Sequence, residues 1–388
     1  MITPKIFSPN FFSDHRSVIA ATLAHFSVDV YSGMLPLILL ILTDPLRMTY
    51  AQVGLVSMSF TLTSSLSQPL FGWLGDRYGH RWLTVAAVAM IATTVGVMRF
   101  VNEYVWLIVL ALIAGLGSGA FHPQGATLAA HAPRELRGRA ASIFMLGGNS
   151  GYALGPIFGA RVFALAGAFL PGVFALIGIA QAALVGWIIP PQTREEPKLK
   201  TLVAKSVQPF VASIAVTLGL VIFLRAWIHS SVTTYIPQVY KSLGFSTDAA
   251  GQILFNILLP VAIGGLIGGT LSDKVGRRRI LILSTALAGP ALWGLLQTAN
   301  ETSFLLAPLL GLTLGASIPV TLVMAQSLIP RGMGMMSGVV FGFTFIAGGI
   351  GVAINGLIAD QFGIVPTMTL NAALLIIAAA LALFLPRD

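Results

Sequence analysis

The sequence predicts an all-α membrane protein with twelve transmembrane helices in two pseudo-symmetric six-helix halves. Three observations lead to this fold class. Hydrophobic residues make up 56% of the 388 residues, charged residues only 9%, and the mean hydropathy is +0.88, whereas soluble proteins carry about 25% charged residues. Long apolar runs recur along the chain, and one polar motif occurs twice.

The apolar runs are long enough to cross a hydrocarbon core of ~30 Å, which takes about 20 helical residues. Backbone polar groups find no water in lipid, and runs without alternating polarity are helices rather than barrel strands. Six runs precede a polar stretch and six follow it: 17–41, 51–74, 82–100, 105–129, 140–165 and 169–190, then 210–238, 248–272, 280–298, 303–328, 335–359 and 365–385. We therefore expect an N-terminal half at 1–190, a cytoplasmic linker at 191–208 and a C-terminal half at 209–388.

The duplicated motif reads G-x-L-x-D-[RK]-x-G-x-R. It occupies residues 72–81, between the second and third runs, and residues 269–278, between the eighth and ninth. Other residues recur at nearly the same offset, and these are Gly115, Gly119 and Pro123, which correspond to Gly311, Gly315 and Pro319. A repeat of half the chain length predicts two similar halves rather than a solenoid of short units.

The basic residues predict the orientation of the chain. If both termini and the linker lie on one side, seventeen lysines and arginines lie there, and only Arg47 and Lys241 lie on the other. The positive-inside rule makes the first side cytoplasmic. The net charge of +9 is then a topology signal, helped by anionic lipid headgroups, and needs no nucleic acid. Arg99 and Arg161 lie near run ends, where we expect them to extend toward headgroups.

Several function classes are excluded or disfavoured by what the sequence lacks. There is no cysteine, which excludes disulfides, thiolate zinc sites and cysteine nucleophiles. Residues 1–16 lack the order of a cleaved signal peptide, so we expect the first run to remain as a span. No catalytic triad or cluster of metal ligands is evident, and we expect no enzyme activity, no cofactor and no metal.

The full chain resembles the major facilitator superfamily, because twelve runs in two halves with this motif after the second run are typical of that family. A narrower resemblance, to the fosmidomycin-resistance transporters, rests on Phe121-His122-Pro123, on residues 142–156 and on residues 331–343. It implies an exporter of small toxic molecules that exchanges them for protons across a bacterial inner membrane. Gln124 stands where that family often has Glu, and Ala111 where many proton antiporters have Arg.

Asp29, His25 and His122 are the candidates for proton coupling. Asp29 is the one acidic residue well inside a run, and His25 lies one helical turn earlier on the same face. Ionisable groups at mid-membrane are expensive and are therefore functional candidates, and histidine changes its charge near neutral pH. The alternative is that these residues only pair or hydrogen bond to hold helices together.

Arg225 lies in the seventh run at the position that matches Asp29 in the first. In a fold of two pseudo-symmetric halves both runs line the central cavity, and arginine keeps its charge at any working pH. We expect Arg225 to bind an anionic substrate or to balance Asp29, with structural pairing as the alternative. The other substrate-binding candidates, which alternatively bond between helices, are His229, Gln124, Asn149, Tyr152, Gln68 and Gln326.

The duplicated loops are candidates for gates that open and close as the halves rock, with topology anchoring as the alternative. In each, a glycine turn reverses the chain, an aspartate can meet a helix N-terminus or an arginine, and basic residues hold the cytoplasmic edge. The gating candidates are Gly72, Asp76, Arg77, Gly79 and Arg81 in the first copy and Asp273, Lys274, Gly276 and Arg278 in the second. Gly151, Gly155, Pro156 and Gly159 resemble the antiporter motif of span five, and we expect them to provide close packing and a bend.

The function that these patterns favour is a proton-coupled antiporter that exports a small toxic compound or drug by alternating access, with an anionic compound as one candidate. The first alternative is a proton-coupled uptake symporter for a small organic anion, and the second is a non-transporting membrane receptor or scaffold. The expected partners are a small-molecule substrate, protons and membrane lipid, and the expected state is a monomer.

Overall fold

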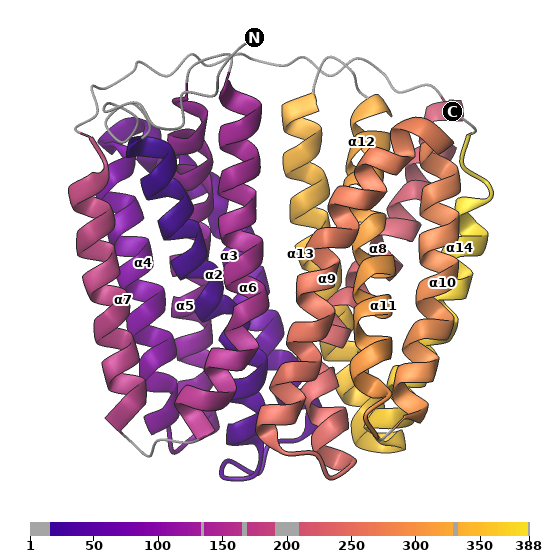
Figure 1. Cartoon of the computed structure of the whole chain (residues 1–388), viewed down its shortest axis with the longest axis horizontal. Coiled ribbons are helices and arrows are strands. Elements are labelled where there is room, and N and C mark those ends of the chain that lie inside the picture. The colour runs from indigo at the N-terminus through magenta and orange to yellow at the C-terminus, as the bar shows by residue number, and fades with distance from the viewer. Residues whose placement is uncertain are drawn as a thin grey trace.

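In the computed structural model the chain is described over residues 16–132, 136–164, 169–190, 209–298, 300–328 and 333–386, and within these ranges it is helical, without strands. Helices α2–α7 form one bundle and α8–α14 a second bundle beside it (Figure 1). The elements are α2 (Arg16–Thr43), α3 (Tyr50–Tyr78), α4 (His80–Val97), η1 (Met98–Phe100), α5 (Tyr104–Ala130), α6 (Arg137–Ala164), α7 (Phe169–Ile188), α8 (Pro209–Ser242), α9 (Thr247–Val275), α10 (Arg277–Gln297), α11 (Ser303–Ala316), α12 (Ile318–Leu328), α13 (Met333–Phe362) and α14 (Ile364–Ala382).

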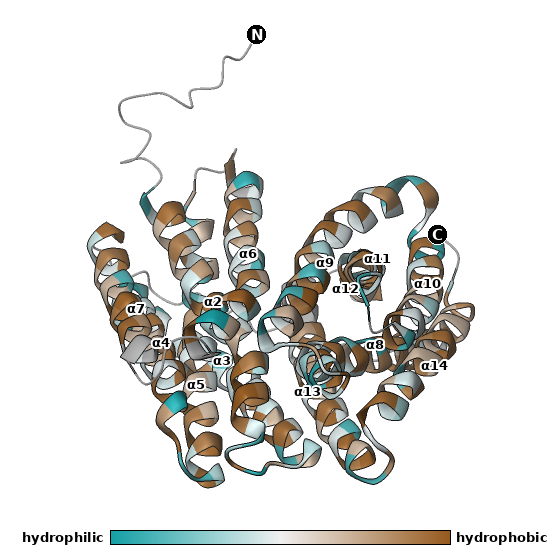
Figure 2. Ribbon diagram, turned by 60° about the horizontal axis from the view of Figure 1, so that its bottom comes forward, coloured by the Kyte–Doolittle hydropathy of each residue, from teal (hydrophilic) through white to brown (hydrophobic). Residues whose placement is uncertain are grey.

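The helices follow the predicted six-plus-six order. Within the described ranges, nine helical segments are long and apolar enough to cross a membrane, and α3, α6 and α7 occupy the remaining positions of the pattern. Hydrophobic residues run along the helices of both bundles (brown in Figure 2). The prediction of an all-α membrane fold is confirmed, while the expected linker at 191–208 lies outside the described residues.

The duplication is visible in how the helices pack. A Cβ atom added at Gly115 or Gly119 of α5 would collide with the backbone of α3, and one added at Gly311 or Gly315 of α11 would collide with the backbone of α9. Small residues at this spacing let two helix backbones approach closely. The two halves therefore repeat the same close helix pair at the same place.

The tenth span departs from the expected single run over 303–328. It is divided into α11 and α12 at Ser317. Pro319 has no backbone N–H, so it cannot donate to the carbonyl of Gly315 as a helix requires. The matching Pro123 lies inside the continuous helix α5, so the break belongs to the C-terminal half.

The two motif loops turn at glycines. Gly79 joins α3 to α4 with φ of 95°, and Gly276 joins α9 to α10 with φ of 104°. Non-glycine residues rarely adopt this backbone conformation. A Cβ at Gly79 would meet no atom of the described residues within 4 Å, so within them the requirement for glycine comes from the turn rather than from crowding.

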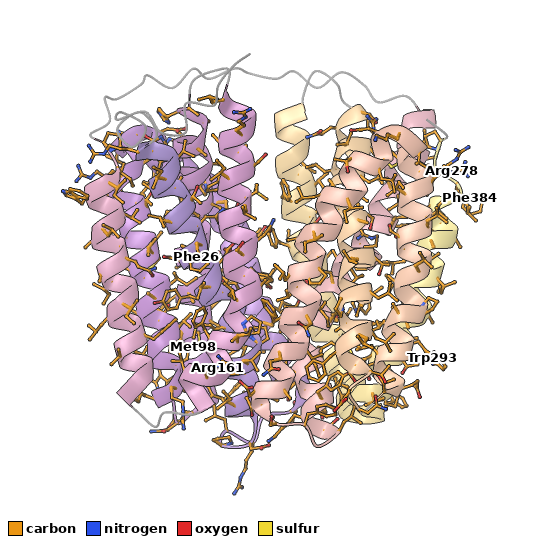
Figure 3. All side chains as sticks on the ribbon, viewed as in Figure 1. Phe26, Met98, Arg161, Arg278, Trp293 and Phe384 are labelled. Carbon is orange, nitrogen blue, oxygen red and sulfur yellow. The ribbon has the colours of Figure 1, made fainter. Side chains whose placement is uncertain are left out.

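Polar contacts join the two bundles at the end away from the chain termini. Both carboxylate oxygens of Asp360 on α13 accept hydrogen bonds at the start of α3, from Tyr50 N (2.7 Å) and Ala51 N (3.1 Å). Arg161 on α6, expected to extend toward headgroups, instead pairs with Asp248 at the start of α9 (Nε–Oδ1, 3.4 Å). Figure 3 shows Arg161 at the opposite end of the molecule from Arg278.

Candidate functional site

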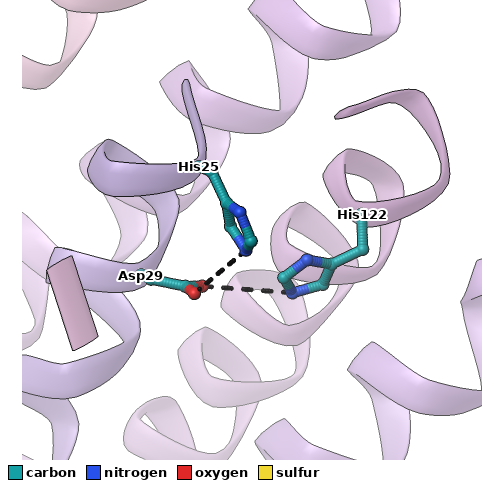
Figure 4. A group of neighbouring side chains, drawn as sticks. All are labelled: His25, Asp29 and His122. Atoms are coloured by element: carbon teal, nitrogen blue, oxygen red, sulfur yellow. Dashed lines mark ion pairs between the residues drawn. The ribbon is translucent and has the colours of Figure 1, made fainter. Parts of the chain in front are cut away.

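Three titratable side chains meet between α2 and α5 (Figure 4). His25 Nε2 lies 3.2 Å from Asp29 Oδ2, and His122 Nε2 lies 4.0 Å from Asp29 Oδ1. The first distance is within reach of a hydrogen bond, whereas the second allows only electrostatic attraction. The structure thus brings together the three residues predicted to couple protons.

The partners of His25 determine where its protons are. Its Nδ1 lies 2.8 Å from the carbonyl oxygen of Phe144, and because a carbonyl only accepts, Nδ1 must carry hydrogen. A neutral imidazole then has a bare lone pair on Nε2, which faces Asp29. A proton must therefore lie between Nε2 and Oδ2, either on the ring as an imidazolium or on the carboxyl group. The pair holds one exchangeable proton in this conformation.

His122 is connected to a short chain of hydroxyl groups. Ser64 Oγ donates to Ser118 Oγ (3.0 Å), which lies 3.3 Å from His122 Nε2. Because Ser118 accepts from Ser64, its own hydrogen is available to donate to His122 Nε2 when the imidazole is neutral. The His122 side chain is 27% exposed, against 7% for His25. His122 is therefore the member of the cluster that is most accessible to water or to a substrate.

Glycines on α6 make room for the cluster. A Cβ at Gly148 would collide with the His25 ring, and one at Gly151 or Gly155 would collide with the backbone of α2. With this close approach, Phe144 of α6 can stack on the His25 ring at 4.1 Å between centroids. The expected role of the span-five glycines in close packing agrees with these contacts, and a Cβ at Gly159 would also press on α2.

The three ligand atoms of His25, Asp29 and His122 lie within 4.8 Å of one another, close enough to share a cation. Imidazole nitrogens and a carboxylate oxygen are ligand types that divalent metals accept. A proton between His25 and Asp29 also satisfies the contact of these two residues.

Arg225 contacts a backbone carbonyl at the end of α11, next to the break between α11 and α12, and not an acidic residue of the described chain. Its guanidinium donates to the carbonyl oxygen of Leu314 (2.6 Å), in the last turn of α11. Carbonyl groups at a helix C-terminus lack helical partners and attract cations. In the part of the chain that the structure describes, no carboxylate oxygen lies within 4.0 Å of this guanidinium. One turn later, Nδ1 of His229 is buried without a hydrogen-bond partner among the residues that the structure describes.

Gln124 bonds to groups of the protein itself in this conformation. It is fully buried, its Nε2 donates to Phe71 O (2.6 Å), and its Oε1 accepts from His80 Nδ1 (2.5 Å). His80 Nε2 lies 3.9 Å from Asp76 Oδ1. Gln124 therefore connects α5 to the first motif loop, which differs from the substrate-binding role predicted for it.

The remaining substrate-binding candidates lie at several places. Tyr152 on α6 lies near both Asp29 and Thr233 of α8, so it reaches across the two bundles. Asn149 is exposed one turn before it on the same helix, whereas Gln68 on α3 and Gln326 on α12 are half-buried. Tyr152 has Asp29 among its electrostatic neighbours.

The gating candidates form local contacts at the ends of helices. The Arg77 guanidinium lies over the rings of Trp73 and Tyr78, at 5.5 Å and 5.6 Å from their centroids. Arg278 in the second copy donates to the carbonyl oxygens of Ala382 and Leu383. Gly72 lies against Pro123 of α5, and Arg81, Asp273 and Lys274 are exposed.

Sequence reasoning missed the partners that orient the cluster. The Phe144 carbonyl carries no side-chain signal, because any residue offers one. Ser118 could have been found, since it lies one helical turn before His122 and can reach it. His80 could also have been found, because it is the polar variable residue in the first copy of the motif.

Comparisons with known proteins agree with this architecture. A family model described as Major Facilitator Superfamily matches residues 18–259 and 218–388. The chain is 30% identical to the fosmidomycin resistance protein of Escherichia coli, over 95% of this chain and 92% of that protein, and 27% identical to the 3-(3-hydroxy-phenyl)propionate transporter of the same bacterium, over 60% and 58%. A bacterial homolog of the human lysosomal transporter Spinster, solved in an inward-facing and occupied conformation, superposes with a TM-score of 0.83 at 16% identity over 97% of both chains. The chain therefore belongs to the major facilitator superfamily, and it is a multi-pass membrane transporter rather than an enzyme.

Proposed function

We propose that this transporter is a proton-coupled antiporter that exports a small toxic compound across the bacterial inner membrane by alternating access. The observation that carries the proposal is the 3.2 Å contact between His25 and Asp29, from which a shared proton is inferred and which faces a third titratable group, His122. Both termini and the linker are cytoplasmic in this proposal, as the basic residues predict.

The charge of the His25–Asp29 pair couples the proton to the substrate. In a low-dielectric cavity, the state of each ionisable group depends strongly on its neighbours. Release of the shared proton leaves a net negative charge on the His25–Asp29 pair, and its return removes that charge. An anionic substrate is disfavoured next to the deprotonated pair, so an anion and the proton favour each other's binding, which is the coupling of a symporter. A neutral or cationic group of the substrate that bonds to the deprotonated carboxylate competes with the proton instead. That competition is the coupling that exchange requires, because by reciprocity the bound group lowers the affinity for the proton as much as the proton lowers the affinity for the group.

Arg225 supplies the fixed positive charge in this mechanism. One of its N–H groups binds the Leu314 carbonyl, and a guanidinium has further donors for a carboxylate or phosphate group. Its charge is not balanced by an acidic residue in the described ranges. The anionic part of a substrate can provide that balance, whereas an Arg225–Asp29 pair would require another conformation.

Contacts between the two bundles at one end of the molecule favour a conformation that is open at the other end. Asp360 bonds to the start of α3, and Arg161 to Asp248, at the end opposite the chain termini. With the termini in the cytoplasm, these contacts seal the outer face. We propose that this conformation accepts substrate from the cytoplasm, as export requires.

The second candidate function is proton-coupled uptake of a small organic anion. It is favoured by the buried charge of Arg225 and by the similarity to a transporter named for a phenylpropionate. The similarity to a fosmidomycin resistance protein over nearly the whole chain favours export.

The test is proton movement in sealed vesicles that contain the purified chain and a pH-sensitive dye. Candidate ligands, beginning with fosmidomycin, are added outside. An antiporter expels a proton as the ligand enters, so the lumen becomes more alkaline, whereas a symporter carries a proton in and the lumen becomes more acidic. Ligand uptake without either change would sink proton coupling, and binding without uptake would indicate a receptor.

A further inference from the structure

An open groove lies on the side of the N-terminal bundle that faces away from the C-terminal bundle, between the start of α4 and the end of α7. Its volume is about 740 Å³, within the ~300–1,000 Å³ typical of ligand sites. Both helices lie at the outer edge of the molecule (Figure 1), and the groove is at the end where the chain termini lie. Its lining includes Arg81, Trp82, Val85, Ala183, Gly186 and Trp187. The lining is therefore mostly apolar, with one guanidinium at the edge.

We propose that this groove binds one anionic phospholipid, with the headgroup phosphate on Arg81 and an acyl chain between α4 and α7. The position of the groove, on the lipid-facing surface of a membrane transporter, makes lipid the molecule that meets it. The choice of an anionic lipid follows from the charges and aromatic rings around it.

Arg81 is available for such a ligand. It is exposed, and within the described chain its guanidinium has no hydrogen-bond or carboxylate partner. Its counterpart Arg278, which ends the second copy of the motif, donates to the carbonyl oxygens of Ala382 and Leu383 after α14. The same motif residue is thus occupied in one half and free in the other.

Arg16 explains why Arg81 does not bond to the end of α7 as Arg278 bonds to the residues after α14. Its Nε donates to Ile188 O and its terminal nitrogen to Trp187 O, both at 3.1 Å, so it occupies the free carbonyls at the end of α7. Its guanidinium also lies 5.9 Å from the centroid of the Trp187 ring. Arg16 therefore replaces Arg81 as the partner of α7 and adds a second positive charge beside the groove.

The apolar part of the site depends on Gly186. A larger side chain there would press on Val85 across the groove, and the matching position in the second half is Leu383. Trp82 and Trp187, which are 49% and 68% exposed, flank the opening. Tryptophan concentrates at the headgroup level of membranes, so the groove has a charged end at the interface and an apolar floor below it.

Native mass spectrometry of the detergent-purified full chain tests the proposal with phosphatidylglycerol and phosphatidylcholine that carry identical acyl chains. We expect one phosphatidylglycerol to bind more tightly than phosphatidylcholine. One basic residue near an anionic surface contributes about 1 kcal/mol, so Arg81→Gln should lower phosphatidylglycerol affinity about fivefold and leave phosphatidylcholine unchanged. Arg279→Gln removes the same charge at the matching edge of the second half and should leave both affinities unchanged.

Gly186→Leu tests the groove without changing the charge, and it should weaken binding of both lipids. No preference for phosphatidylglycerol, equal effects of Arg81→Gln and Arg279→Gln, or unaltered binding in Gly186→Leu would each overturn the proposal. Displacement of the lipid by soluble glycerol 3-phosphate at millimolar concentration would also overturn it, because the site would then recognise a small anion. These readouts involve no transport, so they are independent of the proposed antiport.

Discussion

Replacement of Asp29 by asparagine removes the exchangeable proton while keeping the shape of the site. The Nδ1–H of His25 is fixed by the Phe144 carbonyl, so a neutral imidazole presents a lone pair on Nε2 toward residue 29. The amide of an asparagine there can donate to that lone pair. The variant should therefore fold and keep the contact, with no proton to release.

The expected magnitude follows from one shared proton for each His25–Asp29 pair. A gradient of one pH unit corresponds to about 1.36 kcal/mol per proton, which is a tenfold concentration ratio. In vesicles, the wild-type chain should therefore change its steady-state substrate ratio about tenfold per pH unit for each coupled proton. Asp29→Asn should give a ratio near one at every gradient, while exchange of labelled for unlabelled substrate continues.

Asp44→Asn is the matched control, because Asp44 is an exposed acidic residue in the turn after the same helix. It should retain the wild-type response to pH. A tenfold response that persists in Asp29→Asn, and also in the double variant Asp29→Asn with His122→Gln, would refute the assignment. Protons would then use another route, and Asp29 would be a structural residue.

Four further outcomes are expected. Gly148→Ala should push the His25 ring off Asp29 and abolish the pH response, unlike Gly219→Ala, whose Cβ would meet open space. Asp360→Asn should weaken the closed outer side by about 1 kcal/mol, roughly a fivefold shift toward the outward-open state, measured as a distance change between spin labels on cysteines introduced into this cysteine-free chain; an unchanged distance distribution would contradict this. Asp76→Asn should slow transport with little change in substrate binding, and loss of both in a folded variant would argue against gating. A cysteine at Lys241 should react with reagents applied outside intact cells, and its protection would reverse the topology.

The sequence was sufficient for most of the helical framework. Apolar run length placed the spans, and the repeated glycines indicated two similar halves, whereas the partners of these glycines, α3 for α5 and α9 for α11, came from the structure. The break at Ser317 was not predicted, although Pro319 is visible in the sequence. A proline alone does not indicate a break, since the matching Pro123 lies inside a continuous helix. A proline removes one hydrogen bond in both cases, and the surrounding packing decides whether the helix separates.

The sequence predicted which side chains form the candidate site, but not the contacts that these side chains make with backbone carbonyl groups. His25 and Asp29 are four residues apart, so helical geometry alone places them together. Arg225 contacts the carbonyl of Leu314, and His25 contacts the carbonyl of Phe144. Every residue carries a backbone carbonyl, so the sequence does not indicate which one is the partner. The contact of Gln124 with His80 was not predicted, because His80 lies on a different helix and no local spacing indicates that contact.

The chemistry of this chain lies where its two halves differ. Gene duplication gives both halves the same close helix pairs, so matched positions face matched surroundings unless a side chain changes. Asp29 shares a proton with His25, whereas the matching Arg225 has a fixed charge and holds a broken helix. A carrier with a titratable group on both sides could load protons without binding substrate, and one with a fixed charge on both sides could not respond to pH. The division of one titratable site and one fixed charge between the halves gives a single cavity a charge that depends on pH at Asp29 and a permanent positive charge at Arg225, which is the arrangement that the proposed proton coupling requires.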